Sequence, residues 1–164
     1  MPTLIGLCGY AQVGKDTLAD MLKGEYIKRA FAYKLKVECE RMLSAINIFV
    51  DLRNDEETKK KYRDLLVAWG RIRRAENPLY WVEAVINDLQ DKPTIITDVR
   101  YSNEVKAILD KGGKIIRLHR KGYKPANKEE KMTIGLIDKQ YGTKVLHINN
   151  NGTKEDLLEA FRRL

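Results

Sequence analysis

The sequence predicts an α/β fold in which a five-stranded parallel sheet carries helices on both faces. Short apolar runs alternate with stretches of helical periodicity, which is the pattern of a parallel sheet covered on two sides. No internal repeat, low-complexity tract or Pro/Gly/Ser linker interrupts the chain, so one domain over residues 1–164 is expected. The predicted strands are residues 3–8, 26–32, 93–97, 114–118 and 144–148.

Helices are expected between these strands and after the last one. The first follows Gly14, and the last begins after Thr153, which is a suitable N-cap. A helical insertion is expected at about residues 50–90, within which the charged stretch 51–61 is either a polar helix or a mobile connection. The segment at about 119–142 is polar, contains Pro125 and lacks sustained periodicity, so it is predicted to be a flexible lid. The remaining helices are predicted at 34–46, 62–74, from Pro78 onward, and at 104–111.

Composition narrows the class of protein. The chain of 164 residues has 31 Lys and Arg against 23 Asp and Glu, a formal charge of +8 that favours anionic partners such as nucleotides or nucleic acid. No apolar run approaches the roughly 18 residues of a membrane helix, and no basic segment precedes the first apolar run. Cys8 and Cys39 are not in a Cys-x-x-Cys pair and are expected to be reduced. We therefore expect a cytoplasmic protein without a membrane partner.

The motif that defines the chemistry is GYAQVGKDT at residues 9–17. Two glycines four residues apart, followed by lysine and a hydroxyl residue, form a phosphate-binding loop whose backbone N–H groups point at phosphate oxygens. Lys15 is expected to bridge the terminal phosphates, and Thr17 to ligate Mg²⁺. ATP and Mg²⁺ are the predicted cofactors, and the loop residues expected to hold ATP are Gly9, Ala11, Gln12, Val13, Gly14, Lys15, Asp16 and Thr17.

Asp16 departs from the common form of this motif, which has Ser or Thr directly after the lysine. Its carboxylate is predicted to hold metal-bound water or to accept a proton from the attacking oxygen. The alternative is that Asp16 only stabilises the first turn of the following helix.

Further polar residues follow the other predicted strands: Asp98, Arg120 and Asn150. In parallel sheets, ligands bind beyond the carboxyl ends of the strands, so these residues are expected to share a site with the loop. Asp98 is predicted to organise the metal through bound water, with a structural role as the alternative.

Several stretches resemble the phage-type deoxynucleoside monophosphate kinases, small relatives of adenylate kinase. They are GKDTLA at 14–19, FAYKLK at 31–36, WG at 69–70, ITDVRYSNE at 96–104 and INNNGT at 148–153. In that family Asp after Lys is usual. The resemblance covers nearly the whole chain except the lid, and it implies a three-layer P-loop NTPase sandwich.

The resemblance also implies transfer of the ATP γ-phosphoryl group to a (deoxy)nucleoside 5′-monophosphate, giving the diphosphate and ADP. The acceptor is expected to be bound by Arg100, Arg63, Arg74, Asp98, Trp69 and Lys36. For Arg100 the alternative is an ion pair with Glu104 or Asp98, and for Trp69 it is packing in the core. Arg120 is expected to close over the transferred phosphate, with Asn150 and Gly152 against adenine. Catalysis is thus assigned to Lys15, Asp16, Arg100 and Arg120. A homodimer is compatible with the family, and a phage-encoded member would work in the host cytoplasm.

Two alternatives remain open at this point. One is another small-molecule P-loop kinase, such as one acting on dephospho-coenzyme A or a sugar acid. The other is a nucleic-acid-binding or regulatory module that uses the loop to sense nucleotides; its basic residues are dispersed and form no recognised nucleic-acid motif, so no specific nucleic acid is expected.

Overall fold

The computed structural model describes residues 3–89 and 92–164, and the chain divides into two compact units. The sheet unit comprises residues 1–30 and 89–164, and the helical unit comprises residues 31–88. The helical unit therefore begins at Phe31 rather than near residue 50, because the helix after β2 belongs to it.

The sheet unit contains the five parallel strands that the sequence predicts. They are β1 (Leu4–Cys8), β2 (Ile27–Arg29), β3 (Thr94–Val99), β4 (Lys114–His119) and β5 (Val145–Asn149), in the order β2-β3-β1-β4-β5. The central strand β1 pairs with β3 and β4, and Cys8 lies opposite Val99 on one side and Arg117 on the other. All of β1 is buried, as expected for a strand covered on both faces.

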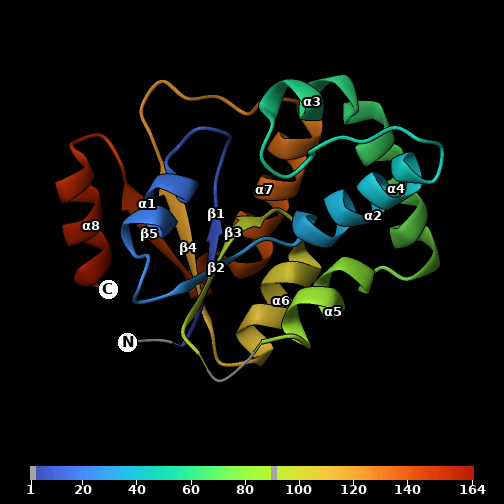
Figure 1. Cartoon of the computed structure of the whole chain (residues 1–164). Helices are drawn as coiled ribbons and strands as arrows, with labels where there is room; N and C mark the ends of the chain where they lie inside the picture. Colours follow the sequence, from blue (N-terminus) through green and yellow to red (C-terminus); the bar gives the residue numbers. More distant parts are fainter. Residues whose placement is uncertain (1–2, 90–91) are drawn as a thin grey trace. The chain divides into compact units, whose positions relative to one another are not determined.

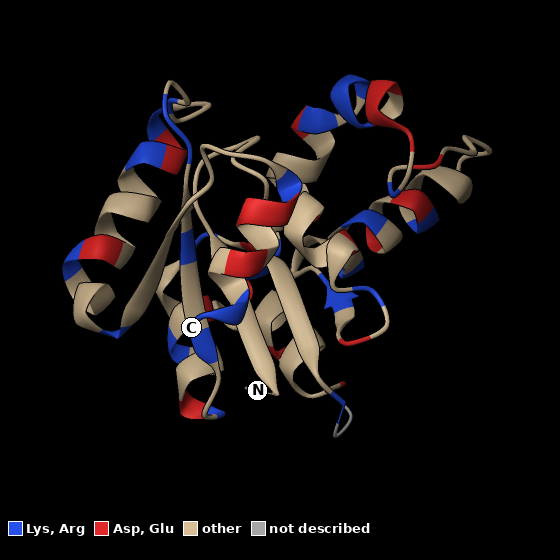
Figure 2. Ribbon diagram, turned by 90° about the vertical axis from the view of Figure 1, so that its left-hand side faces the viewer, with Lys and Arg blue, Asp and Glu red and all other residues tan. Residues whose placement is uncertain are grey.

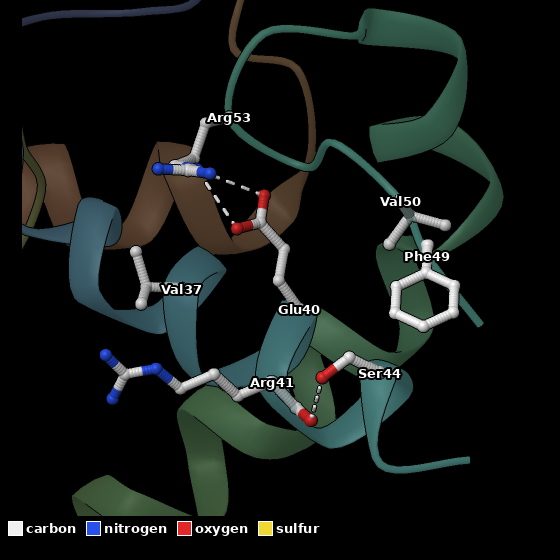
Figure 3. A pocket seen from close by; sticks show the side chains of 7 residues that line it. All are labelled: Val37, Glu40, Arg41, Ser44, Phe49, Val50 and Arg53. Carbon is white, nitrogen blue, oxygen red and sulfur yellow. Dashed lines mark hydrogen bonds and ion pairs between the residues drawn. The ribbon is translucent and has the colours of Figure 1, made fainter. Parts of the chain in front are cut away.

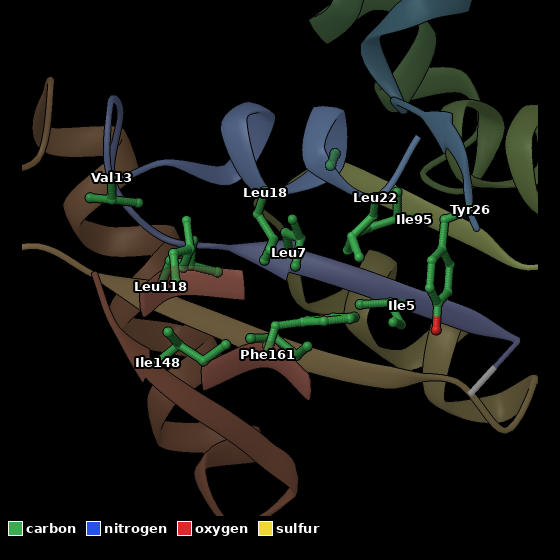
Figure 4. Close-up of a cluster of buried hydrophobic side chains, with 13 residues drawn as sticks. Ile5, Leu7, Val13, Leu18, Leu22, Tyr26, Ile95, Leu118, Ile148 and Phe161 are labelled. Atoms are coloured by element: carbon green, nitrogen blue, oxygen red, sulfur yellow. The ribbon is translucent and has the colours of Figure 1, made fainter. Parts of the chain in front are cut away.

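Helices cover both faces of this sheet (Figure 1). The helices α1 (Lys15–Met21) and α8 (Lys154–Arg162) lie together on one face, and α6 (Ser102–Asp110) and α7 (Lys128–Tyr141) lie on the other. The core under α1 and α8 is drawn in Figure 4, where side chains of β1, β4 and β5 meet those of the two helices: Ile5, Leu7, Leu18, Leu22, Leu118, Ile148, Leu157 and Phe161.

The final helix begins where the sequence places it. The Thr153 hydroxyl accepts a hydrogen bond from the Asp156 N–H at 3.2 Å, and the Asp156 carboxylate accepts one from the Thr153 N–H at 2.8 Å. This reciprocal capping satisfies two N–H groups that the helix leaves unpaired. It fixes the turn between β5 and α8 next to the phosphate-binding loop.

Part of the predicted lid has regular structure that the weak periodicity of its sequence did not indicate. Residues 128–141 form α7, capped by the Asn127 side chain, which accepts from the Glu130 N–H at 2.8 Å. Only Thr133, Ile134 and Ile137 are buried, so a narrow apolar stripe lies among polar residues and gives a weak periodic signal. A 3₁₀ turn at Gly142–Lys144 then leads into β5.

The helical unit consists of α2 (Ala32–Ser44), α3 (Glu56–Lys61), α4 (Arg63–Glu76) and α5 (Tyr80–Ile86). For the charged stretch 51–61 the sequence allows either a polar helix or a mobile connection. Residues 56–61 form helix α3. Asp55 caps this helix, and its side chain accepts a hydrogen bond from the Glu57 N–H. The buried residues Cys39, Leu43 and Leu52 form the centre of this unit, and partly buried side chains, including Leu35, Leu66 and Trp69, pack around them.

Glu104 in the first turn of α6 is a buried carboxyl group. It accepts hydrogen bonds from the backbone N–H groups of Arg100 at 2.6 Å and Tyr101 at 3.0 Å, and it is 6% exposed. Burial, followed by the negative charge of Asp98, raises the pKa of Glu104 to about 8. Glu104 therefore holds the turn after β3 and binds a proton more tightly in the folded protein than in the unfolded chain.

This shift predicts a pH dependence of stability. The folded protein retains a proton on Glu104 from its ordinary pKa up to about 8, so this carboxyl should lower the free energy of unfolding as pH rises through that window. Glu104→Gln keeps an acceptor for the two N–H groups but does not titrate. We expect its melting temperature to fall less between pH 5 and pH 8 than that of the wild type.

The matched control is Glu155→Gln on the exposed face of α8. Thermal melts are recorded at intervals between pH 5 and pH 8. The melting temperature of this variant should change with pH as that of the wild type does. An unchanged pH dependence in Glu104→Gln would show that the carboxyl titrates in the folded protein as it does in water.

Candidate active site

The phosphate-binding loop runs from the end of β1 to the start of α1, and its shape depends on two glycines. Gly9 has a φ of 137°, and a Cβ there would lie 2.5 Å from the carbonyl oxygen of Leu118. Gly14 has a φ of 104°, and a Cβ there would lie 2.4 Å from the side-chain nitrogen of Asn150. Any other residue at either position would be strained in its backbone and would collide with a fixed neighbour.

Lys15, at the first position of α1, folds back over the loop. Its ammonium group donates hydrogen bonds to the carbonyl oxygens of Gly9 at 2.8 Å and Tyr10 at 2.7 Å. Burial lowers the pKa of Lys15, and the positive charge of Arg100 lowers it further. Lys15 at the start of α1 and Arg100 after β3 are thus close enough for their positive charges to interact. Two neighbouring positive charges favour an anionic ligand.

A cavity of about 480 Å³ opens beside the loop within the sheet unit. Its volume lies within the range of small-molecule sites. It brings together residues from β1–α1, from the segment after β4 and from the turn between β5 and α8. Arg120, predicted to close over the transferred phosphate, lines it together with most of the residues predicted to hold ATP: Gln12, Gly14, Lys15, Asp16, Thr17, Asn150 and Gly152.

Three of the predicted loop residues do not line this cavity. Gly9 and Val13 are buried behind the loop, where Val13 is part of the core under α1 and α8, and Ala11 is exposed on its outer side. The sequence analysis did not single out Tyr123, Thr153, Lys154 and Leu157 as ligand contacts, and these complete the lining. The Arg120 guanidinium lies over the Tyr123 ring at 4.9 Å. Both follow β4, so the turn after that strand supplies an aromatic and a cationic wall.

Asp16 points to the open edge of the cavity. Its side chain is 72% exposed and forms an ion pair with Lys28 of β2 at 2.8 Å, and Lys28 also contacts Asp20 at 2.9 Å. The carboxylate is therefore partly neutralised but remains accessible. Such an exposed pair contributes little to stability, so a metal or a ligand can displace Lys28 at small cost.

The donors at this cavity fit Mg²⁺ in the manner of a nucleotide-bound ion. Among residues 3–89 and 92–164, no cluster of three or more His, Cys, Asp or Glu side chains is arranged to hold a metal. Mg²⁺ is usually held by one or two protein oxygens together with phosphates and water. Asp16 and Thr17 line the cavity and provide such oxygens, whereas Asp98, half-buried on β3, does not line it.

Arg100 is exposed just after β3. The predicted alternative was an ion pair with Glu104 or Asp98, but Glu104 binds the backbone N–H of Arg100 instead. The carboxylate thus fixes where the arginine emerges from the strand. Glu104 was missed as a site residue, although Glu at the third position of a helix is a known capping signal.

The helical unit contains four further predicted acceptor residues: Lys36, Arg63, Trp69 and Arg74. Arg63 is exposed, and the other three are half-buried. The Trp69 indole N–H donates a hydrogen bond of 2.8 Å to the Glu38 carboxylate. The same carboxylate accepts a hydrogen bond from the Tyr80 hydroxyl. The polar edge of Trp69 is therefore engaged within the unit.

Arg73 completes this cluster. Its Nε lies 3.4 Å from the Glu38 carboxylate, and its guanidinium lies over the rings of Trp69 at 5.0 Å and Tyr80 at 4.5 Å. One carboxylate thus joins α2, α4 and α5. Nothing in the sequence pattern marks Glu38 as this centre.

A second cavity, of about 380 Å³, lies within the helical unit beside α2 (Figure 3). Arg53 and Glu40 form an ion pair in its wall, with Nε and a carboxylate oxygen 3.0 Å apart. None of the predicted acceptor residues lines it; its walls are Val37, Glu40, Arg41, Ser44, Phe49, Val50 and Arg53.

His119 and His147, to which the sequence analysis assigned no chemistry, lie side by side on β4 and β5. Their rings stack with centroids 5.1 Å apart, and Nε2 of His119 lies 2.8 Å from Nδ1 of His147. The pair is outside the cavity lining.

Among the described residues, no helix has the length and apolar character needed to cross a membrane.

Two solved structures with a similar fold are a dephospho-CoA kinase and a gluconokinase. Dephospho-CoA kinase from Campylobacter jejuni superposes with a TM-score of 0.53 at 10% identity, covering 99% of this chain and 95% of that one. A gluconokinase from Sinorhizobium meliloti 1021 gives a TM-score of 0.53 at 12% identity, covering 97% and 89%. At such identities the likeness establishes the fold, a P-loop kinase fold, as the sequence predicted.

No curated protein matches the sequence. The family model for phosphomevalonate kinase matches residues 7–113, which include the phosphate-binding loop, the whole helical unit, β3 and α6. The predicted resemblance to deoxynucleoside monophosphate kinases is thus supported as far as the P-loop kinase fold and phosphotransfer, and its finer part stays a prediction. The chain belongs to the phosphomevalonate kinase family.

Proposed function

We propose that this protein transfers the γ-phosphoryl group of Mg-ATP to a phosphate monoester, and that the monoester is a deoxynucleoside 5′-monophosphate. The observation that carries the proposal is the position of Lys15, which folds over the phosphate-binding loop and lines the cavity beside it, with Arg100 exposed just after β3. Arginine suits a phosphate because its planar group binds two oxygens at once and stays charged. The donor phosphates would occupy the cavity beside Lys15, and the acceptor phosphate would bind at Arg100.

The two acceptor classes suggested for this chain share one chemistry. The resemblance suggests a nucleoside monophosphate and the family model suggests phosphomevalonate, and both present a phosphate group. An oxygen of that phosphate attacks the γ-phosphorus, the bond from the γ-phosphorus to the β–γ bridging oxygen breaks, and ADP leaves with that oxygen. A phosphate monoester with a second pKa near 6 is mostly deprotonated at neutral pH, so its attacking oxygen needs no general base. Asp16 is then better suited to the metal than to proton transfer.

The remaining roles follow from position. Lys15 would stabilise the charge that spreads over the γ-phosphoryl group, and Asp16 and Thr17 would hold Mg²⁺, directly or through water. Mg²⁺, when bound, would neutralise negative charge on the donor phosphates. Arg120 and Tyr123 would cover the ATP side of the cavity. The helical unit, through Lys36, Arg63, Arg74 and Trp69, would bind the acceptor, as the resemblance implies.

Phosphomevalonate is the second candidate because the family model matches the whole helical unit. Phosphomevalonate has no base. It would bind the cationic residues of the helical unit, and the aromatic residues of that unit would have no ring to stack on. A nucleic-acid role has less support: acidic and basic residues are interspersed over the surface (Figure 2), and both α3 and α8 contain the two kinds, which does not favour binding of a continuous phosphate backbone.

The first experiment is an acceptor screen. ADP release from Mg-ATP is measured with each deoxy- and ribonucleoside monophosphate and with phosphomevalonate, supplied separately. Turnover with one or more nucleoside monophosphates is expected. Turnover with phosphomevalonate alone would replace the nucleotide assignment, and no turnover with any of them would reject the proposed function.

Lys15→Ala should reduce kcat by several orders of magnitude, because the loop loses the charge that faces the transferred group. Circular dichroism and melting temperature should stay near those of the wild type. The control is Lys111→Ala, an exposed lysine in the turn after α6, with the same loss of charge. Near-normal turnover of Lys15→Ala would contradict the loop mechanism.

Arg100→Ala should mainly weaken the acceptor side, with KM for the monophosphate raised at least tenfold and KM for ATP nearly unchanged. Steady-state kinetics with each substrate varied in turn measure this. Arg163→Ala, at the surface end of α8, removes the same charge elsewhere and should behave as wild type. If acceptor KM and kcat are both unaffected in Arg100→Ala, the acceptor phosphate binds at another residue.

A further inference from the structure

We infer that Asn150 is a positioning residue whose side-chain amide holds the phosphate-binding loop in shape. This inference rests on the proposed function in one respect, the binding of nucleotide phosphates by that loop. It changes the role predicted for Asn150 from contact with adenine to support of the backbone that binds phosphate.

Asn150 is well placed for this role. It lies directly after β5 and is 9% exposed. Its side-chain nitrogen donates a buried hydrogen bond to the carbonyl oxygen of Val13 at 2.9 Å, joining residues 137 positions apart in the sequence. The same nitrogen occupies the place that a side chain at Gly14 would need. Asn150 therefore contacts both residues that lead from the loop into α1.

The loop needs such support because its backbone is costly to form. Gly9, Gln12 and Gly14 all have positive φ, and Gln12, at 63°, is in the left-handed region without being glycine. A side chain other than glycine makes this conformation less stable than the right-handed one. Glycines also lose more conformational freedom than other residues when they are ordered. Bonds from outside the loop are needed to offset these costs.

Two side chains supply the bonds, but only one can keep its bonds when nucleotide is present. Lys15 donates to Gly9 and Tyr10, and these bonds must break when its ammonium group turns to the phosphates. The amide of Asn150 contacts the opposite end of the loop, behind the phosphates, and has no reason to move. The bond to Val13 is thus the support that persists during binding and transfer.

Asn150 is itself fixed by neighbouring strands. Its backbone N–H donates to the carbonyl oxygen of His119 at 2.7 Å, and the next residue, Asn151, accepts from the Lys121 N–H at 2.7 Å. These bonds lie on either side of Arg120. The turn after β5 therefore links the loop to the segment that carries Arg120 and Tyr123.

The test measures binding of Mg-ATP and of inorganic tripolyphosphate by isothermal titration calorimetry, together with the melting temperature. Asn150→Ala should weaken both ligands by about tenfold, which corresponds to roughly 1.4 kcal/mol. The melting temperature should fall moderately while the protein stays folded, because the buried Val13 carbonyl loses its donor. Asn149→Ala is the matched control, because the neighbouring asparagine is exposed and makes none of these contacts.

Tripolyphosphate separates the two roles because it has phosphates and no base. A loss of ATP affinity with unchanged tripolyphosphate affinity would mean that Asn150 contacts adenine, and would overturn the inference. Unchanged affinity for both ligands would overturn it as well. If Asn150→Ala does not fold, Asn150→Ser, which is too short to reach Val13, gives the same comparison. Because binding is the readout, a failed acceptor screen would reject the proposed function without deciding this result.

Discussion

The structure depends on how closely the chain after β1 approaches the end of β4. At Gly9 the backbone passes so near the Leu118 carbonyl that no side chain fits. This contact lets β1 end directly in the phosphate-binding loop, with Val13 returning into the core under α1 and α8. Because the loop is packed on its rear side, its front side is left for a ligand, and the polar ends of β3, β4 and β5 complete that side.

Electrostatics at this edge of the sheet follow from the same packing. Burial of Lys15 lowers its pKa, and Arg100 adds a second positive charge that the turn after β3 holds in place through Glu104. Both cations would gain from a bound phosphate group, whereas an uncharged ligand would leave them opposed.

The strands and the loop were predictable from sequence because each leaves a strong local signal, whereas the order of the strands in the sheet was not predicted. Apolar runs ending in Gly9, Asp98, Arg120 and Asn150 located one edge of the sheet, and the spacing of Gly14, Lys15 and Thr17 identified the loop. The failures have a physical cause too. Helix α7 buries only a narrow stripe, so its periodicity is weak, and Glu38 joins three helices through contacts between residues far apart in sequence. The sequence around Asn150 is that of an ordinary turn. The hydrogen bond from its side-chain amide to Val13 could not be predicted, because the two residues are far apart in the sequence.

The hydrogen bond between the Asn150 amide and the loop limits which segments of this fold could be exchanged between relatives. The match to the family model ends at residue 113, before β4, β5 and α8, yet these elements supply much of the core under α1 and the only described side-chain amide bonded to the loop. Residues 7–113 are therefore a unit of sequence similarity that lacks part of the core packed against α1. A chimaera that exchanged this segment between relatives would have to carry over the asparagine after the last strand, or the transplanted loop would lose its scaffold.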